Sequence, residues 1–383
     1  MEDYKKNFKG KTVLITGGAG GIGSNLTRAI AELEAKTVIV LDNMTAAYEW
    51  NIPSLSNVLF VNGSITDEVC LKRVFAMKPD IVYHLAAFFA NQNSVDFPER
   101  DLNVNGLGTL LMYQYAQMCN IERFIYASSG CSIYGSSAPL PLKEDFMSMH
   151  LTTPYQITKM LGELYGNFFF HHYKLPIVKA RFFNSYGPGE VPGQYRNVIP
   201  NFIYRAMKGL ELPFTGTGEE TRDFTFVGDI VDGLLRTAYF KEAIGQEMNL
   251  ASGRETKILD LAKKINELTG NKAGIAWAPP RVWDTKKRLL ASVERANNLI
   301  GYDPSMDFNK GLEVTINWFK ENWDQIDIDA EFPPGMSAAV NGLVQEKKKS
   351  TSREDWEKDH STERPSRIEP SNKKSELDIS PGH

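Results

Sequence analysis

Short apolar runs alternate with longer amphipathic runs along the first half of the chain. The apolar runs are rich in β-branched residues and predict strands at 11–16, 37–41, 58–61, 81–85, 124–128 and 177–182. The amphipathic runs predict helices at 22–33, 68–77, 102–119 and 155–173. Nearly continuous apolar strands separated by helices are typical of a parallel sheet covered on both faces. With right-handed crossovers, this alternation predicts a doubly wound α/β sheet.

A glycine-rich turn joins the first predicted strand to the first predicted helix. The segment TGGAGGIG (16–23) spaces Gly17, Gly20 and Gly23 as Gly-x-x-Gly-x-x-Gly, and with Gly18 it also satisfies Gly-x-Gly-x-x-Gly. Glycines permit a tight turn and let backbone N–H groups approach a pyrophosphate, while the helix N-terminus adds partial positive charge. The position between a strand and a helix favours a dinucleotide site over a merely flexible turn.

Asp42 ends the second predicted strand, roughly 20 residues beyond the last of these glycines. A carboxylate there can accept hydrogen bonds from the hydroxyl groups of an adenosine ribose, whereas it repels a 2′-phosphate. No Arg or Lys follows directly in DNMTAAYEW (42–50). The pattern therefore predicts NAD rather than NADP, and a helix-capping role for Asp42 is the alternative.

The pattern changes twice after residue 183. NSYGPGEVPGQYRN (184–197) is rich in Gly and Pro and indicates a loop, and short mixed elements follow to about 323. The last residues are polar and mixed in charge, and cannot bury enough surface to offset the entropy of ordering. We predict a Rossmann domain over 1–183 and a smaller, mixed α/β, mainly substrate-binding domain over 184–330, some segments of which return to the sheet. A disordered polar tail is predicted over 331–383.

Tyr155 and Lys159 form Tyr-x-x-x-Lys at the start of a predicted helix. Residues four apart share one helical face. The ammonium group, together with the positive charge of a nicotinamide, is expected to lower the tyrosine pKa from about 10 toward neutrality. Such a tyrosine can take a proton from an alcohol while hydride leaves the same carbon. The alternative is a surface Tyr/Lys pair, which the preceding dinucleotide motif disfavours.

Hydroxyl groups follow the fifth predicted strand in YASSGCSIYG (126–135). The carboxyl end of a parallel strand lies at the mouth of the sheet, where ligands bind. Ser128, Ser129 and Ser132 all compete for a hydrogen bond to the reacting oxygen. The neighbouring Cys131 has no evident His partner, so we interpret it as a packing residue at the border of the site.

Composition narrows the class of protein. Of the 383 residues, 43 are Lys or Arg and 47 are Asp or Glu, and the net charge of −4 gives no indication of a nucleic-acid or anionic-membrane partner. Three widely spaced cysteines suit a reducing cytosol, and no Cys/His cluster predicts a metal site. The chain shows no signal segment or bilayer-length apolar run, so we expect a cytoplasmic protein.

These motifs together resemble the extended short-chain dehydrogenase/reductases, and within them the NAD-dependent nucleotide-sugar epimerase/dehydratase group that includes UDP-glucose 4-epimerases. The resemblance covers about residues 10–325. It depends on the order of TGGAGGIGSNL, LDN, HLAA (84–87), NGLGT (105–109), SSGCSIYG, PYQITK (154–159), RFFNSYGPG (181–189), VIPNFI (198–203) and TRDFTFVGDI (221–230).

The resemblance implies roles for individual residues. The NAD pyrophosphate, adenosine, adenine and nicotinamide contacts are expected from Gly17, Gly20, Gly21, Ile22, Gly23, Asp42, Asn43, Ser64, Ile65, Leu85, Ala86, Ala87, Asn105, Tyr155 and Lys159. Ser64 stands where the family usually has Asp. Substrate contacts are expected from Ser94, Ser129, Asn184, Arg222 and Arg281.

The serine segment distinguishes among the reactions of this group. Counting back from Tyr134-Gly135, Gly130 falls where many members of the family carry the catalytic Ser or Thr. Other members have a glycine-containing segment that is one residue longer. This sequence matches that form, which makes Ser129 the residue that supplies the hydroxyl group. The resemblance then gives Tyr155, Lys159 and Ser129 as the catalytic residues. Dehydratases carry Asp-Glu in this segment and decarboxylases carry Glu, but residues 130–133 are Gly-Cys-Ser-Ile, so elimination lacks its acid and base.

We therefore expect epimerisation of a nucleotide sugar, a UDP-sugar by family frequency, at C4 through a transient 4-keto intermediate. A dehydratase, decarboxylase or 4-ketoreductase is the alternative within enzymes. A non-catalytic protein that binds NAD and sugar nucleotide is the alternative of another class. The resemblance also predicts a homodimer, formed through the helices expected at 102–119 and 155–173.

Overall fold

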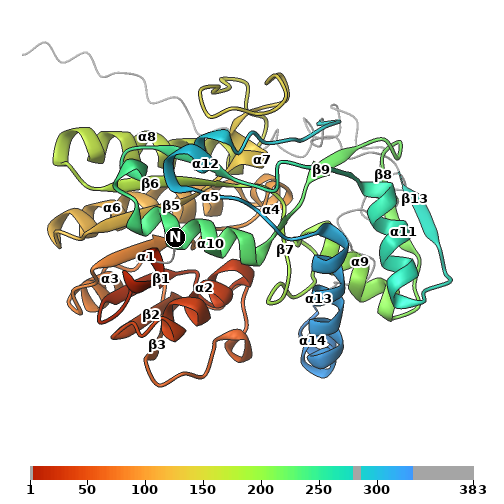
Figure 1. Ribbon diagram of the computed structural model, residues 1–383, viewed down its shortest axis with the longest axis horizontal. Coiled ribbons are helices and arrows are strands. Elements are labelled where there is room, and N and C mark those ends of the chain that lie inside the picture. Colours follow the sequence, from red (N-terminus) through yellow and green to blue (C-terminus); the bar gives the residue numbers. More distant parts are fainter. Residues whose placement is uncertain (1–2, 279–285, 331–383) are drawn as a thin grey trace, which may run out of the picture.

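Seven parallel strands form the central sheet of the computed structural model, which describes residues 3–278 and 286–330 (Figure 1). Their order is β11-β6-β5-β4-β1-β2-β3, so the direction of winding reverses between β1 and β4. The strands are β1 (Thr12–Thr16), β2 (Thr37–Asp42), β3 (Val58–Asn62), β4 (Ile81–His84), β5 (Arg123–Ser129), β6 (Ile177–Phe182) and β11 (Glu247–Leu250). The predicted doubly wound Rossmann sheet is thus present.

Helices cover both faces of this sheet. One face packs against α1 (Asp3–Lys6), α2 (Gly21–Glu32), α10 (Val227–Tyr239) and α12 (Glu294–Ile300). The other face packs against α3 (Glu68–Phe75), α6 (Thr109–Met118) and α8 (Pro154–Tyr173). Alternate residues of one strand serve the two layers, as when Val13 and Ile15 face α2 while Leu14 faces α6. Burial on both faces explains why the strands read as uninterrupted apolar runs.

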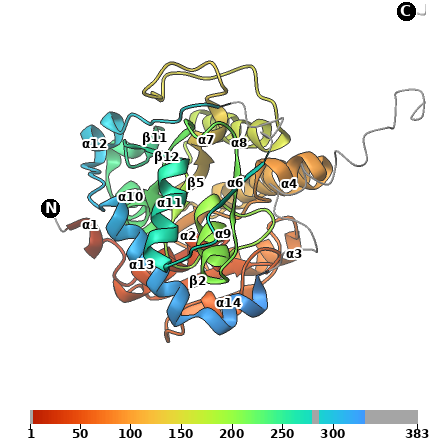
Figure 2. The same cartoon turned by 90° about the vertical axis from the view of Figure 1, so that its right-hand side faces the viewer.

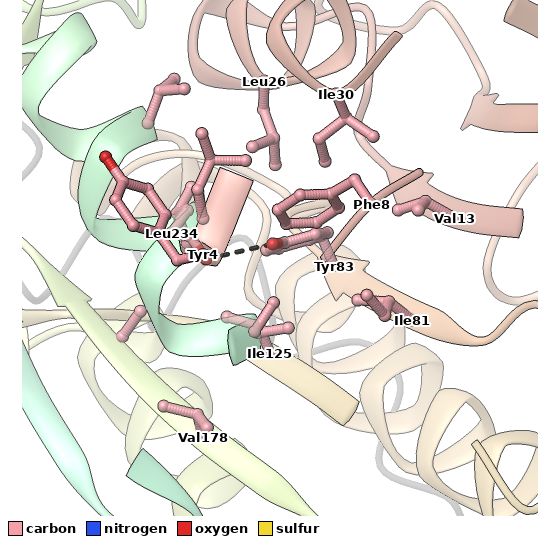
Figure 3. Packing of buried hydrophobic residues seen from close by; sticks show 14 of the residues in the cluster. Tyr4, Phe8, Val13, Leu26, Ile30, Ile81, Tyr83, Ile125, Val178 and Leu234 are labelled. Atoms are coloured by element: carbon pink, nitrogen blue, oxygen red, sulfur yellow. Dashed lines mark hydrogen bonds between the residues drawn. The ribbon is translucent and has the colours of Figure 1, made fainter. Parts of the chain in front are cut away.

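The second half of the chain contributes to the helix layer that contains α1 and α2. Helix α10 packs against α2 and strand β11 pairs with β6. In Figure 3, the hydroxyl of Tyr83 in β4 reaches the carbonyl of Leu234 in α10, to which it donates a hydrogen bond of 3.0 Å. The sheet is therefore completed by residues that lie far beyond 183 in the sequence.

A smaller group of elements packs beside the carboxyl ends of the strands (Figures 1 and 2). Its apolar centre joins α9, α11 and α13. Short strand pairs, β10 with β7, β12 with β9 and β13 with β8, connect its loops. Its elements are β7 (Ser185–Tyr186), α9 (Val198–Met207), β8 (Leu212–Thr215), β9 (Thr221–Asp223), β10 (Thr225–Phe226), β12 (Glu255–Lys257), α11 (Ile258–Thr269), β13 (Ile275–Ala278), α13 (Phe308–Glu321) and α14 (Trp323–Asp329).

The helix predicted at 102–119 is divided. A π-helical turn (Leu102–Gly108) precedes α6, and the short helices α4 (Asn91–Asp96) and α5 (Pro98–Asp101) come before it. The wider turn lies where the side chain of Asn105 points inward and bonds both backbone groups of Phe88, at 2.8 and 3.0 Å. Periodicity alone could not show this, because the cause is a tertiary contact.

The tail predicted at 331–383 lies outside the described residues, as does Arg281. No helix in the described ranges is both long enough and apolar enough to cross a membrane.

Candidate active site

A cavity of about 500 Å³ opens at the carboxyl ends of the strands, where the winding of the sheet reverses. Its lining includes most of the residues that the sequence predicted for a site. These are Gly17, Gly20, Gly21, Ile22, Gly23, Asp42, Asn43, Ser64, Ile65, Leu85, Ala86, Ala87, Ser129, Tyr155, Lys159, Asn184 and Arg222. Asn105 and Ser94 are absent from the lining.

The glycine turn is held by backbone contacts that leave no room for side chains. Gly17 has a φ of +71°, and a Cβ there would lie 2.7 Å from the nitrogen of Ala86. A Cβ on Gly23 would overlap the carbonyl oxygen of Gly17 and lie 2.7 Å from Gly18 Cα. Gly20 caps α2, so the first N–H groups of that helix face the cavity end that these glycines form. The turn fits a pyrophosphate.

Asp42 ties the turn to the second strand. Its carboxylate accepts hydrogen bonds from the N–H of Ala19 at 3.2 Å and of Met44 at 3.0 Å. Burial raises the pKa of Asp42, and these N–H groups oppose that rise. The side chain lines the cavity beside Asn43, where a ribose of a dinucleotide can reach it.

A segment that the sequence indicated only as loop passes over this end of the cavity, and we call residues 187–197 the crossing segment. Asn51 donates to the carbonyls of Ala19 and Gly189, at 3.1 and 2.8 Å. Tyr195 donates to the Asp96 carboxylate at 3.0 Å. Glu190 packs against Gly21, and burial raises the pKa of this carboxyl to about 7. The crossing segment thus joins the glycine turn to α4.

Tyr155 and Lys159 lie in the first two turns of α8, as the four-residue spacing predicts. Both side chains are buried, and the Lys159 ammonium lies 5.6 Å from the centre of the Tyr155 ring. Lys159 donates to the carbonyl of Ala127 at 2.8 Å. Burial lowers the pKa of Lys159 to about 8, while the charge of Asp101 raises it.

Burial raises the pKa of Tyr155 above its usual range in the chain without a cofactor, and the negative charge of Asp101 raises it further. The hydroxyl of Ser129 acts in the opposite direction. The lowering predicted from the sequence needs the positive charge of a nicotinamide as well as that of Lys159, so it stays a prediction for the protein with NAD bound.

The three candidate serines differ in their hydrogen-bond partners. Ser128 donates to the buried Glu163 carboxylate at 2.5 Å. Ser129 donates to Ser132 at 2.9 Å, and its hydroxyl lies close enough to Tyr155 to lower the pKa of that tyrosine. A Cβ on Gly130 would overlap the ring of Phe183, so no hydroxyl-bearing side chain fits there.

Ser94 and Asn105 support the site without reaching the cavity. The Ser94 hydroxyl, which is fully buried, donates to the carbonyl of Asn91 at 2.7 Å and accepts from the N–H of Tyr155 at 3.1 Å. The sugar contact predicted for Ser94 is thus not what the structure shows, because its hydroxyl is used at the start of α8. Asn105 fixes Phe88 and bonds Asp101 at 2.7 Å. It positions the loop after β4, which lines the cavity.

Cations gather at the end of the cavity near Cys131. Arg222 donates to the carbonyl of Lys286 at 3.0 Å, and Lys286 in turn donates to the carbonyl of Cys131. The Cys131 thiol accepts from the N–H of Asn184 at 3.4 Å, and burial raises its pKa, which agrees with a packing role. Lys286 belongs to the basic run from which the sequence singled out Arg281. Its proximity to the cavity could not be predicted, because it arises from the return of a distant segment.

Few acidic side chains line the cavity. Over the described residues, the acids that line the cavity are Asp42, Glu190 and Glu220. Asp42 lies at the end of β2 and bonds the glycine turn, and Glu190 belongs to the crossing segment. Glu220 accepts from the N–H groups of Thr217 and Gly218. The segment 129–132 therefore has no carboxylate partner among them.

Comparison with known proteins adds the family context. Residues 13–251 match the model of the NAD dependent epimerase/dehydratase family. The structure of Epimerase Mth375 from Methanothermobacter thermautotrophicus shares 55% identity, with a TM-score of 0.85 over 86% of this chain and 98% of that one. The Bordetella bronchiseptica enzyme WbmF, solved in complex with NAD+, shares 36% identity with a TM-score of 0.74 over 84% and 96% of the two chains.

A relative named for its reaction is also similar. UDP-glucose 4-epimerase from Mycolicibacterium smegmatis is 31% identical over 80% of this chain and 98% of its own length. Relatives with decarboxylase and dehydratase names match at 28% to 30% identity. Similarity alone therefore leaves the reaction open within this group.

Proposed function

Because the chain belongs to the NAD-dependent epimerase/dehydratase family, we propose that it inverts a nucleotide sugar, specifically a UDP-sugar, at C4 through a transient 4-keto intermediate. The proposal rests on one observation: of the described residues in the cavity, no carboxylate accompanies the segment 129–132 beside Tyr155. Elimination of water needs an acid and a base at that position. Removal and return of hydride needs only a group that exchanges a proton with the C4 hydroxyl.

The residues that line the cavity fit NAD. The N–H groups at the start of α2 and the glycines around them would hold the pyrophosphate, with Asp42 and Asn43 at the adenosine ribose. Ser64 and Ile65 would flank the adenine, and Leu85 to Ala87 would line the remaining wall. NAD bound there supplies the hydride acceptor and donor, and its pyridinium charge favours the phenolate form of a nearby tyrosine.

The reacting groups have separate tasks. Tyr155 takes the proton of the C4 hydroxyl and later returns it, while the nearby Ser129 hydroxyl favours the phenolate form of this tyrosine. Lys159 is held by Ala127 so that its charge stays beside Tyr155. Asn184 and Arg222 also line the cavity, and the guanidinium of Arg222 can bind a diphosphate through two parallel hydrogen bonds.

A substrate panel tests the reaction. Purified protein is incubated with UDP-, dTDP-, GDP- and CDP-hexoses and with UDP-uronates, and the products are identified by NMR. We expect inversion at C4 of at least one UDP-sugar, without net oxidation. Formation of a 4-keto-6-deoxy sugar, or loss of CO2 from a uronate, would contradict the proposal.

We also propose that the protein is a homodimer. Apolar side chains project into solvent from the π-helical turn and α8, at Leu102, Leu107, Ile157, Leu164 and Phe168. These two elements pack side by side, so the side chains form one surface. Exposed apolar surface of this kind marks association. Mass measurement in solution should give twice the chain mass of 43.0 kDa, and Leu164→Glu with Phe168→Glu should give the single mass.

A further inference from the structure

The loop after β2, residues 43–52, contacts the glycine end of the cavity with one side, and we call it the β2 loop. Its residues 45–47 line the cavity. The carbonyl of Ala46 accepts a hydrogen bond from Arg196 of the crossing segment. Asn51 bonds the glycine turn and the crossing segment, as described above. These contacts join the three segments at the same end of the cavity.

The other side of the β2 loop packs into the smaller group of elements. The ring centres of Tyr48 and Trp50 lie 6.2 Å apart with 24° between the planes. Trp50 stacks in turn on Trp318 of α13, at 6.0 Å and 21°. Trp50 also packs against the apolar centre that joins α9, α11 and α13. A loop that starts at the Rossmann sheet is therefore anchored in the core of the other group.

Asp329, the last residue of α14, accepts from the polar groups of both loop rings. The indole N–H of Trp50 donates to its carboxylate at 2.6 Å, and the hydroxyl of Tyr48 donates to its carbonyl at 2.8 Å. A hydrogen bond to a charged acceptor is among the stronger ones in proteins. Trp50 and Asp329 do not line the cavity, so they reach it only through the β2 loop.

We propose that Trp50 and Asp329 are positioning residues that slow the release of NAD, because they anchor the β2 loop to α13 and α14. Helix α14 thereby contributes to the retention of the cofactor without touching it. This inference rests on the proposed function, in which the cavity holds NAD through repeated turnovers.

The proposed reaction makes such retention useful. Inversion at C4 returns NAD to its starting state in every turnover, so no step requires the cofactor to leave. A ketoreductase, in contrast, must exchange its oxidised cofactor for a reduced one after each turnover. An anchored β2 loop therefore agrees with inversion better than with the alternative of net reduction.

The test measures how fast radiolabelled NAD leaves the full-length protein when unlabelled NAD is added in excess. Trp50→Phe keeps an aromatic ring but loses the N–H group, and we expect release to become about fivefold faster. Trp50→Ala also loses the stack, and we expect release to become about 30-fold faster. Asp329→Ala should resemble Trp50→Phe, whereas Asp329→Asn keeps an acceptor and should restore a rate close to that of the wild type.

Tyr204→Phe is the matched control, because it removes a donor to another carboxylate of α14. The Tyr204 hydroxyl donates to Asp327 at 2.8 Å and joins α14 to α9, not to the β2 loop. We expect Tyr204→Phe to lower the melting temperature about as much as Trp50→Phe but to leave NAD release unchanged. A purely structural role of Trp50 would make the two variants behave alike.

The outcomes separate this inference from the proposed function. Release at the wild-type rate from folded Trp50→Ala, or equally fast release from Tyr204→Phe and Trp50→Phe, would overturn the inference. If Trp50→Ala does not fold, Asp329→Ala decides the question, since an unchanged release rate there has the same meaning. Faster release from the Trp50 variants of a protein that inverts no sugar would support the anchoring and overturn the proposed function.

Discussion

The two ends of the cavity are built in different ways. The dinucleotide end comes from one continuous turn, residues 16–23, whose shape is imposed by backbone atoms at Gly17 and Gly23. The other end, called the reacting end after the proposed function, gathers Ser129, Tyr155 and Lys159 from two segments. Ser129 and Lys159 are fixed there by hydrogen bonds to Ser132 and to the carbonyl of Ala127. The first end depends on the absence of side chains, whereas the second depends on the surroundings of side chains that are present. Substitutions at the glycine turn should therefore act through overlap with backbone atoms. Substitutions at the reacting end should act through lost hydrogen bonds and charges.

The largest effect is expected at the reacting end. Tyr155→Phe removes the hydroxyl that we propose exchanges the proton, and general acid–base catalysis contributes about 10²- to 10⁴-fold. We expect kcat for C4 inversion to fall by that factor, measured by NMR, with NAD content and melting temperature unchanged. Equal activity of the variant and the wild type would favour a protein that binds without catalysis.

Gly23→Ala tests the dinucleotide end. Its methyl group would overlap Gly17, so we expect the free energy of unfolding to fall by about 1–3 kcal/mol and bound NAD to be lost. Gly20→Ala is the matched variant, because its Cβ would lie 3.4 Å from Gly17 O, and it should unfold like the wild type. Denaturant unfolding measures both. Similar losses in the two variants would mean that backbone overlap does not shape the turn.

Lys159→Met tests burial at the reacting end. Burial lowers the pKa of Lys159 from its model-peptide range to about 8, so between pH 8 and 10 the unfolded chain binds more protons than the folded one. The wild type should therefore become more stable as pH rises through this window. The full cost of burying the charged Lys159 is present below pH 8. We expect the Met variant to be more stable by roughly 1–3 kcal/mol at pH 7 and to lose that advantage by pH 10. Urea unfolding at both pH values checks the sign.

The smallest effect is expected where the crossing segment meets α4. Tyr195→Phe removes an exposed hydrogen bond to Asp96, worth about 1 kcal/mol, so NAD should dissociate a few times faster. Tyr115→Phe removes a comparable bond to Glu68 on the far helix layer and serves as the control. Stopped-flow release of NAD distinguishes them. Identical rates in both variants would show that the crossing segment does not retain the cofactor.

The same contrast explains what could be predicted from the sequence. The sheet strands and most helices could be predicted, because each follows a fixed period along the chain. The presence of the glycine turn, Asp42, Tyr155 and Lys159 in one cavity could also be predicted, because each motif has a fixed spacing. The bonding of Ser94, the π-helical turn at Asn105 and the raised pKa of Tyr155 could not be predicted, since each depends on partners brought close only by folding. Lys286 and the crossing segment belong to this second class.

The seventh strand, β11, has a consequence for biosynthesis. Residues 247–250 close the edge of the sheet beside β6, and α10 covers the face on which Tyr83 lies. Arg123 in β5 donates to the carbonyls of Thr237 and Phe240 at the end of α10. A nascent chain that has emerged only to residue 183 would present this apolar face and an open strand edge to water. The ribosome must therefore release about 70 more residues before the nucleotide-binding half can finish folding, and a fragment cut at residue 183 should aggregate.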